Sequence, residues 1–239
     1  MKRTINLVGY LKDDVNSFFD KIELNLKGLS FNVSERYYET TVEIMGDEEL
    51  REEFIDVVRR FADTFKNFVY GINEENVYKC AYKLLKDKNL KVAFAEGVSA
   101  GRLASEFVCQ NDESVAEILV EADVNLSKES QIRRYGILPS FFETYQLESV
   151  EAVYELARGG LYVSTADVIV ATAGIASDDE MAVDNGKCFI AVGDNKVINV
   201  FKHNFTGSKN KIMQQLAKFS FLHLIKKLRD NNLEYVTRF

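Results

Sequence analysis

Apolar and polar positions in the first part of the chain fall into strand-like and helix-like patterns. Short apolar-rich segments with period-two spacing are typical of strands, and apolar residues that recur every three or four positions indicate amphipathic helices. The predicted elements are strands at 5–8, 31–33, 37–43 and 68–70 and helices at 15–22 and 50–65. Asp47 is the expected N-cap of the second helix, and Gly71 ends the last strand. These patterns predict a small α+β unit.

From Leu90 the pattern changes to that of a layered α/β domain. A continuous apolar run over 90–95 is followed by a small-residue turn over 97–101 and a helical pattern over 103–108, the order strand, turn, helix. Further strands are predicted at 115–124, 168–172, 188–192 and 197–201, and helices at 127–135, 149–158 and 211–228. We therefore expect an α+β unit over 1–72, a connecting helix over 73–89 and an α/β domain over 90–239.

Composition narrows the class of protein. The 239 residues include 30 basic and 37 acidic side chains, a formal net charge of −7, which does not favour binding to nucleic acid or to an anionic membrane. No window approaches the roughly 20 apolar residues of a membrane-spanning helix. Three widely spaced cysteines favour reduced thiols. We expect a cytoplasmic protein with neither a membrane nor a nucleic acid as partner.

The residues that usually ligate metals are sparse. The two histidines, His203 and His223, lie 20 positions apart with no cysteine or carboxylate at ligand spacing, so packing or surface roles are expected for both. Cys188 lies in an apolar strand pattern, which is typical of a buried, inert thiol. No G-x-S-x-G motif is present. We expect neither a metal nor a cofactor.

Two small-residue loops are the strongest candidates for a ligand site. The first, 95–101 (Ala-Glu-Gly-Val-Ser-Ala-Gly), lies between a strand and a helix, where backbone N–H groups and the helix N-terminus favour an anion such as phosphate. The second, 173–177 (Ala-Gly-Ile-Ala-Ser), also follows a strand. Ligands of open α/β sheets bind at the carboxyl ends of strands, so both loops are expected to face one pocket. Two purely structural turns are the alternative.

These loops carry a resemblance to a known family. The stretch from Leu90 to about Asn232 resembles the C-terminal domain of the competence/damage-inducible CinA family. Four family motifs occur in order, A-E-S-x-T-G-G at 95–101, T-G-I-A-G-P at 173–178, G-T-V-Y-I-A at 186–191 and F-x-G-x-R at 205–209. Residues 1–89 look like the KH-like segment of longer members, without a basic G-x-x-G loop for RNA. The molybdopterin-binding-type domain of those members has no counterpart here, so its pyrophosphatase activity is not expected.

The resemblance implies a layered α/β fold, a homo-oligomer and nicotinamide-nucleotide amidohydrolase chemistry, but the motif residues depart from the family pattern. The position of the likely nucleophilic serine is Gly97, and the tyrosine and lysine positions fall on Leu126 and Gln131. The threonine of the second loop is Ala173. Because amide hydrolysis requires a nucleophile and a base, these departures predict a catalytically degenerate member.

Three hypotheses remain open from the sequence. The first is a protein that binds nicotinamide mononucleotide or a related nucleotide, or a protein partner, without hydrolysis. The expected ligand-binding residues are Glu96, Gly97, Ser99, Gly101, Gly174, Ile175, Ala176 and Lys209. The second is an active amide hydrolase with Ser99 as a relocated nucleophile and Lys128 as its base. The third is a structural protein with a vestigial pocket.

Overall fold

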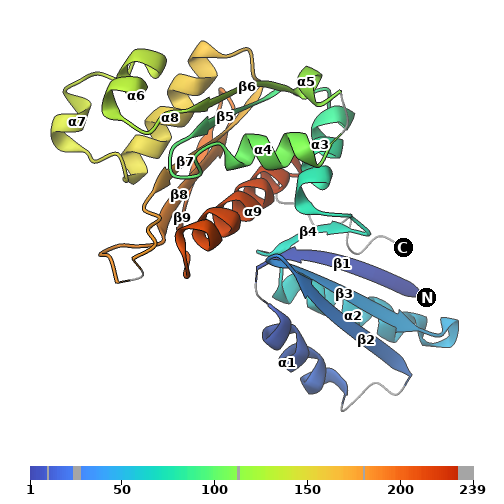
Figure 1. Ribbon diagram of the computed structural model, residues 1–239. Coiled ribbons are helices and arrows are strands. Elements are labelled where there is room, and N and C mark those ends of the chain that lie inside the picture. The colour runs from blue at the N-terminus through green and yellow to red at the C-terminus, as the bar shows by residue number, and fades with distance from the viewer. Residues whose placement is uncertain (10, 24–27, 112–113, 180, 231–239) are drawn as a thin grey trace.

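A computed structural model describes the chain except for residues 10, 24–27, 112–113, 180 and 231–239. It contains two sheets, one of four strands built from the first part of the chain and one of five strands built from the rest (Figure 1). We refer to the parts that carry these sheets as the N-terminal unit and the C-terminal unit. The layered α/β class expected for the longer part is confirmed.

The N-terminal unit is an antiparallel sheet covered by two helices. Its strands are β1 (Lys2–Val8), β2 (Leu29–Arg36), β3 (Glu39–Gly46) and β4 (Val69–Ile72), in the order β2-β3-β1-β4, and its helices are α1 (Lys12–Glu23) and α2 (Arg51–Thr64). Ile5 and Ile44 face a core of phenylalanines from the helices, in which the rings of Phe19 and Phe61 stack with centroids 5.6 Å apart. Aromatic burial of this kind stabilises a small sheet.

The prediction that Asp47 caps the helix of residues 50–65 is wrong. A single 3₁₀ turn, Glu48–Leu50, comes between Asp47 and α2, and the side chain of Asp47 makes no capping hydrogen bond. The tighter turn moves the start of the α-helix to Arg51, so the residue with the favoured cap chemistry lies too far upstream.

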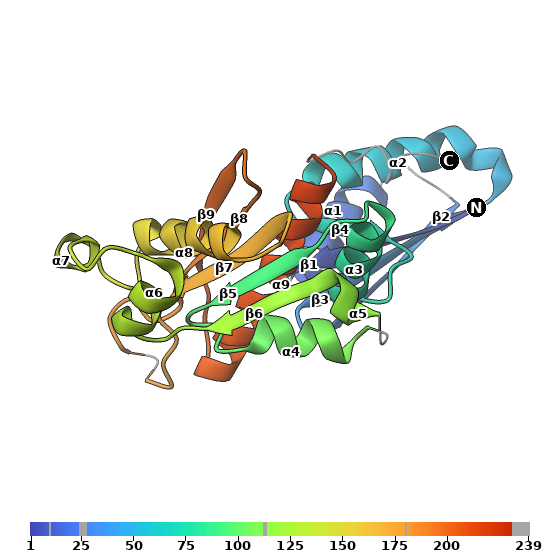
Figure 2. The same ribbon diagram turned by 90° about the horizontal axis from the view of Figure 1, so that it is seen from above.

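The C-terminal unit is a three-layer α/β/α arrangement. Its strands are β5 (Val92–Glu96), β6 (Leu119–Val124), β7 (Val168–Gly174), β8 (Lys187–Gly193) and β9 (Ile198–Asn204), in the order β6-β5-β7-β8-β9. Strands β6, β5 and β7 are parallel, and β8 and β9 are added antiparallel. One face carries α3 (Val77–Asp87), α4 (Arg102–Cys109) and α9 (Lys209–Leu228), and the other carries α6 (Lys128–Tyr135) and α8 (Val150–Val163) (Figures 1 and 2). Two single-turn helices, α5 (Val115–Ile118) and α7 (Phe141–Thr144), complete the unit.

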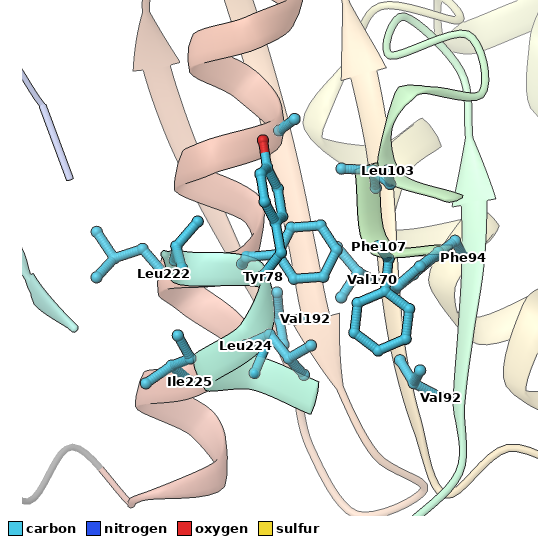
Figure 3. Close-up of a cluster of buried hydrophobic side chains, with 14 of the residues drawn as sticks. Tyr78, Val92, Phe94, Leu103, Phe107, Val170, Val192, Leu222, Leu224 and Ile225 are labelled. Carbon is cyan, nitrogen blue, oxygen red and sulfur yellow. The ribbon is translucent and has the colours of Figure 1, made fainter. Parts of the chain in front are cut away.

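Alternation along β5 explains why helices cover both faces of this sheet. Val92 and Phe94 point into the core beneath α3, α4 and α9, whereas Ala93 and Ala95 point into the core beneath α8. Figure 3 shows the first of these cores, where the ring of Phe107 packs edge-on against Phe94 with centroids 5.5 Å apart. A strand buried on both faces has no polar side, which accounts for its continuous apolar run.

Two predicted elements have different bounds in the structure. The segment 115–124, expected to be one strand, begins as α5 and becomes β6 only at Leu119. Helix α8, expected to end at 158, continues through Gly159 and Gly160 to Val163. A Cβ at Gly159 would lie 2.5 Å from the Cβ of Tyr135, and one at Gly160 would lie 2.3 Å from Ile169 Cδ1. The two glycines therefore allow close packing instead of ending the helix.

Helix α9 joins the two units along its length. Lys218 forms a buried ion pair with Glu39 at the start of β3, and Lys226 Nζ donates to the carbonyl of Asn67 at 2.6 Å. Most side chains of α9 are buried, as expected of a helix surrounded by protein. Within the described residues, no helix is both long enough and apolar enough to cross a membrane.

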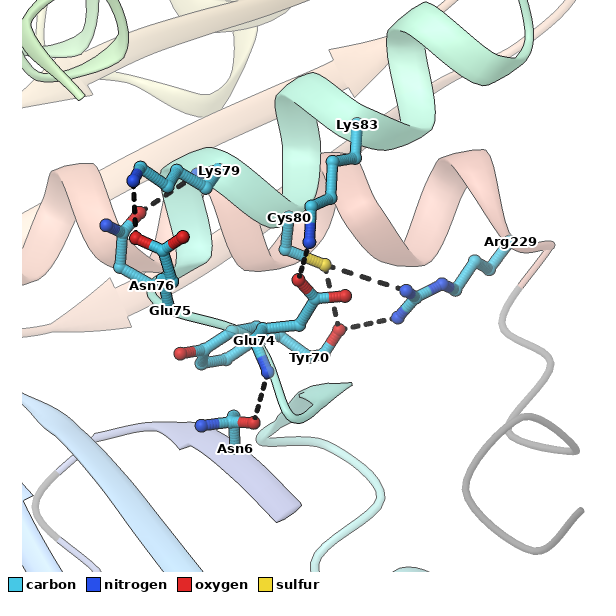
Figure 4. Close-up of polar contacts among 9 residues, drawn as sticks. All are labelled: Asn6, Tyr70, Glu74, Glu75, Asn76, Lys79, Cys80, Lys83 and Arg229. Carbon is cyan, nitrogen blue, oxygen red and sulfur yellow. Dashed lines mark hydrogen bonds and ion pairs between the residues drawn. The ribbon is translucent and has the colours of Figure 1, made fainter. Parts of the chain in front are cut away.

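Figure 4 shows a third contact between α9 and the N-terminal unit, at the junction of β4 and α3. Arg229, just after α9, donates to the carbonyl of Tyr70 at 2.5 Å, and the thiol of Cys80 also lies against this carbonyl. Asn6 on β1 accepts from the backbone N–H of Glu74 at 3.0 Å. The connection between the units is therefore held by hydrogen bonds from both of them.

Candidate functional site

The structure brings the two sequence-predicted loops to one edge of the C-terminal sheet. Strands β5 and β7 are parallel neighbours, with Glu96 in register with Thr172, so the loops that follow them start side by side. The N–H of Gly97 donates to the carbonyl of Thr172 at 3.0 Å, and the N–H of Asn125 after β6 donates to the carbonyl of Glu96 at 2.9 Å. We call this region the β5–β7 edge.

Glu96 is the centre of a buried hydrogen-bond network at this edge. Its carboxylate accepts from the Ser99 hydroxyl at 2.8 Å and from the backbone N–H groups of Leu103 and Ala104 at 3.0 and 2.9 Å. The two N–H groups belong to the first turn of α4, which has no partner of its own for them. The carboxylate therefore occupies the end of α4 that the sequence analysis assigned to a bound anion.

The hydroxyl of Ser99 is fully used inside this network. Its oxygen lies 2.6 Å from the Thr172 hydroxyl, and both side chains have no exposed surface. Because the single proton of Ser99 goes to the Glu96 carboxylate, the Thr172 hydroxyl must be the donor to Ser99. Lys128, the base of the relocated-nucleophile hypothesis, has its Nζ over the ring of Phe142 at 5.9 Å from the centroid. This geometry gives Ser99 the role of an internal anchor of the loop.

Gly97 stands where the resemblance predicts a serine, and its surroundings favour a glycine. An added Cβ would lie 2.6 Å from the carbonyl oxygen of Thr172, closer than real Cβ contacts allow. The loop thus approaches β7 so closely at this point that a side chain requires the backbone to move.

The two other departures from the family pattern lie in different environments. Leu126 is 64% exposed, whereas Gln131 on α6 is buried. The amide of Gln131 donates to the carbonyl of Asn125 at 3.2 Å, and its oxygen has no hydrogen-bond partner in the described part of the chain. The family-implied base position therefore holds a neutral group with one unsatisfied acceptor.

A tyrosine that the sequence analysis missed lies beside Gln131. The hydroxyl of Tyr135 accepts from the side-chain amide of Asn125 at 3.0 Å. Burial, followed by the nearby charge of Asp123, raises the pKa of Tyr135 well above its ordinary value, which keeps the phenol protonated. Its position could have been found from the sequence, because Gln131 and Tyr135 are four residues apart in a predicted helix and share one face.

The second loop is organised differently from its prediction. Ala173 and Gly174 still belong to β7, and the loop turns back at Ile175, whose N–H donates to the carbonyl of Lys187 at 3.0 Å. Asp178 accepts from the backbone N–H of Lys209, the first residue of α9, at 3.2 Å. The second loop and the start of α9 therefore lie together.

Lys209 is an exposed cation beside this edge. Its side chain is exposed and takes part in none of the ion pairs found among the residues that the structure describes. On α4, Arg102 donates to the side chain of Asn210 at 2.6 Å, which brings the start of α9 beside the start of α4. The β5–β7 edge thus combines two glycine-containing loops with the beginnings of two helices. In the described residues, no cluster of three or more metal-ligating side chains is present.

The fold and this edge define a three-layer α/β domain whose loops meet at the ends of parallel strands. The family model "CinA C-terminal domain" matches residues 74–228, more than half of the chain. The chain belongs to this family, as its motifs predicted.

Curated relatives carry competence-related names. A "CinA-like protein" of Thermotoga maritima is 27% identical over 180 residues, covering 74% of this chain and 43% of the relative. A "putative competence-damage inducible protein" of Finegoldia magna is 25% identical over 169 residues, covering 71% and 40%. A protein of that name from Caldicellulosiruptor saccharolyticus is 20% identical over 222 residues, covering 90% and 54%. This chain therefore spans about half the length of these relatives.

Solved structures confirm the fold of the C-terminal unit. A competence-damaged protein (CinA) superfamily member from Klebsiella pneumoniae superposes with a TM-score of 0.60 at 21% identity, covering 65% of this chain and 99% of that one. The competence/damage-inducible protein CihA of Agrobacterium tumefaciens gives 0.58 at 18% identity, covering 65% and 97%. At these identities the likeness concerns the fold alone.

Proposed function

We propose that this CinA-family chain binds a nicotinamide-type mononucleotide at the β5–β7 edge and does not hydrolyse it. The observation that carries this proposal is the hydrogen-bond chain from Thr172 through Ser99 to Glu96. Ser99 is the only hydroxyl of the first loop, and it is buried with its proton held by Glu96. With Gly97 at the serine position, the loop presents no nucleophile to a bound amide.

The phosphate of the ligand is assigned to Lys209. Two backbone N–H groups in the first turn of α4 already donate to Glu96, and one N–H of α9 donates to Asp178. Neither helix end therefore binds the phosphate by itself. The exposed ammonium of Lys209 supplies a positive charge next to the start of α9. A lysine at this position binds phosphate as a point charge, without the bidentate geometry of the family's arginine.

The test compares nicotinamide mononucleotide with nicotinamide riboside, which lacks only the phosphate. Binding to the native state raises the melting temperature by mass action, and isothermal titration calorimetry gives the affinity. We expect the mononucleotide to bind about tenfold more tightly than the riboside, an increment typical of one charge-assisted contact. Lys209→Gln abolishes this preference, and Lys211→Gln, two residues along the same helix, preserves it.

The hydrolase hypothesis is tested in the same samples by measuring ammonia. No release above the buffer rate is expected from the unmodified chain or from Ser99→Ala. If the unmodified chain releases ammonia robustly and the Ser99→Ala variant does not, the alternative holds: the chain is an active amide hydrolase with Ser99 as nucleophile. If neither ligand binds at millimolar concentration and no ammonia is released, the edge is a structural feature only.

We also propose that the chain forms a homo-oligomer, as the family resemblance implied. Several apolar side chains of the C-terminal unit are largely exposed, among them Leu138 at 70%, Met181 at 90% and Val183 at 87%. Protein contacts bury apolar surface of this kind when such residues lie together in one patch. Light scattering coupled to size-exclusion chromatography is expected to give a mass that is a multiple of 27.2 kDa. A monomer at micromolar concentration would contradict this proposal.

A further inference from the structure

A cavity of about 610 Å³ lies where the N-terminal unit meets β9 and α9, and we call it the β9–α9 cavity. Leu11 and Phe68 line it from the N-terminal unit, and His203, Phe205 and Phe219 line it from the C-terminal unit. Its volume is in the range of about 300–1,000 Å³ that is usual for small-molecule sites. None of its described lining residues belongs to the loops of the β5–β7 edge.

The walls of the cavity are largely aromatic. The rings of His203 and Phe205 are stacked, with centroids 5.2 Å apart and planes at 6°, and Phe219 lies 5.3 Å from Phe205. In the same lining, Phe201 stacks on His223 with ring centroids 3.7 Å apart. Phe205 is buried, whereas Phe219 is partly exposed, and a partly exposed ring favours another planar ring because offset stacking adds to the burial of apolar area.

Two imidazoles form a neutral polar pair in this wall. His203 Nε2 and His223 Nε2 lie 2.8 Å apart, so one nitrogen donates and the other accepts. His223 is nine-tenths buried, and its Nδ1 has no hydrogen-bond partner in the described part of the chain. Burial lowers the pKa of His203 to about 4 and holds that of His223 well below its ordinary value, so both rings are uncharged near neutral pH.

Lys226 supplies the charge of the cavity. Its Nζ donates to the carbonyl of Asn67 at 2.6 Å, which leaves further N–H donors on the ammonium. No carboxylate is present among the described residues that line the cavity. A positive charge in an aromatic cavity without a balancing acid favours an anionic ligand over a neutral or cationic one.

We propose that the β9–α9 cavity is a binding site for a small planar aromatic carboxylate. The ring stacks against Phe219 in the aromatic wall, and the carboxylate accepts from the ammonium of Lys226. His203 and His223 are uncharged and polar, so Lys226 is the positive charge that contacts the carboxylate. Both units contribute to the cavity, so a ligand here contacts residues of both.

The experiment uses the full chain and three probes that separate ring from charge. Indole-3-carboxylate has both features, indole-3-carboxamide keeps the ring without the charge, and cyclohexanecarboxylate keeps the charge without the aromatic ring. The chain has only two histidines, so their imidazole proton resonances report on the cavity directly. Indole-3-carboxylate is expected to shift both resonances saturably and to bind about tenfold more tightly than either of the other probes.

Two variants and two controls locate the contacts. Lys226→Gln is expected to remove the preference for the carboxylate over the carboxamide, whereas Lys227→Gln leaves it, because Lys227 pairs with Asp194 outside the cavity at 3.0 Å. Phe219→Leu weakens both indole probes alike. Lys209→Gln has no effect on either of them, which separates this site from the β5–β7 edge.

Three results would overturn the proposal. The first is the absence of a saturable shift of either histidine resonance with indole-3-carboxylate at millimolar concentration. The second is equal affinity for the carboxylate and the carboxamide in the unmodified chain. The third is an unchanged preference in Lys226→Gln when thermal unfolding shows that the variant is folded. Because the Phe219→Leu series does not alter Lys226, it tests the ring contact even if the lysine variant is unstable.

Discussion

The β5–β7 edge and the β9–α9 cavity differ in how their buried polar groups are satisfied. At the edge, the carboxylate of Glu96 has three hydrogen-bond donors, and the hydroxyls of Ser99 and Thr172 are paired. In the cavity wall, an imidazole nitrogen of His223 has no partner among the described residues. The two loop motifs mark the first region, whereas the lining of the second includes a single motif residue, Phe205. A motif can therefore persist as a structural brace while unsatisfied polar atoms, Gln131 Oε1 on α6 and His223 Nδ1 on α9, lie outside its loops.

The largest effect is expected from Glu96→Ala. The variant leaves the Ser99 hydroxyl and two N–H groups of α4 without their buried acceptor, which lowers the free energy of unfolding by about 3–5 kcal/mol. Urea denaturation measures the change. Glu96→Gln keeps one acceptor oxygen and should cost less. A loss below about 1 kcal/mol for the alanine variant would show that the network is not a brace.

A smaller loss is expected from Gly97→Ala, which tests why the serine position is a glycine. The new Cβ would meet the Thr172 carbonyl at 2.6 Å, so the loop must move, at a cost near the upper end of the usual 1–3 kcal/mol, about 3 kcal/mol. Gly136→Ala is the matched control, because nothing lies within 4 Å of its Cβ and only the strain of its positive φ remains. Equal losses in the two variants would remove the steric explanation.

The histidine pair predicts acid sensitivity of the fold. The native pKa of His203, about 4, lies below the ordinary value of about 6.5 because the ring is buried. Between these values the unfolded chain binds a proton that the native chain does not, so stability falls as pH falls through this window. The loss from His203 is up to about 2 kcal/mol between about pH 7 and pH 5.

Urea denaturation of His203→Gln at both pH values measures this loss. His223 and Lys226 face His203 from α9, Tyr38 lines the same cavity, and Cys188 is the register partner on β8. None of them is a carboxylate that would raise the pKa of His203. The variant should lose less stability on acidification than the unmodified chain. An identical pH dependence would mean that His203 is protonated in the native state.

The smallest effect is expected from Ser99→Ala. Removing the hydroxyl leaves Glu96 with its two backbone donors and leaves the buried Thr172 hydroxyl without its acceptor, a loss of about 1 kcal/mol. Thermal unfolding detects such a change. A destabilisation as large as that of Glu96→Ala would place Ser99, and not the carboxylate, at the centre of the network.

Much of the fold was predictable because local patterns and global packing agree. The apolar run of β5 and the three- and four-residue spacing in α2 predicted both elements. Two features depend on contacts between distant residues. Gly159 and Gly160 continue α8 because Tyr135 and Ile169 pack against them, which no local pattern shows. The change from α5 to β6 at Leu119 also has no local signal, because the residues on both sides of it are apolar.

The candidate site likewise has features that the sequence predicted and features that it did not. The adjacency of the two loops followed from the rule that ligands gather at the ends of parallel strands, and the family motifs placed Glu96 and Lys209 near them. The use of Glu96 as a helix cap and the burial of Ser99 depend on exact distances, which the sequence does not carry. The β9–α9 cavity was beyond prediction because its walls come from two units that are far apart in the chain.

Helix α9 also has a consequence for the order in which the protein is made. Lys218 and Lys226 on α9, and Arg229 just after it, contact residues of the N-terminal unit that leave the ribosome 159 to 179 residues earlier. Until α9 emerges, Glu39 is without its lysine and the early sheet stays partly uncovered. Docking of the first unit is therefore a late event in synthesis, and a nascent chain stalled before α9 should be more open to proteases than the finished protein.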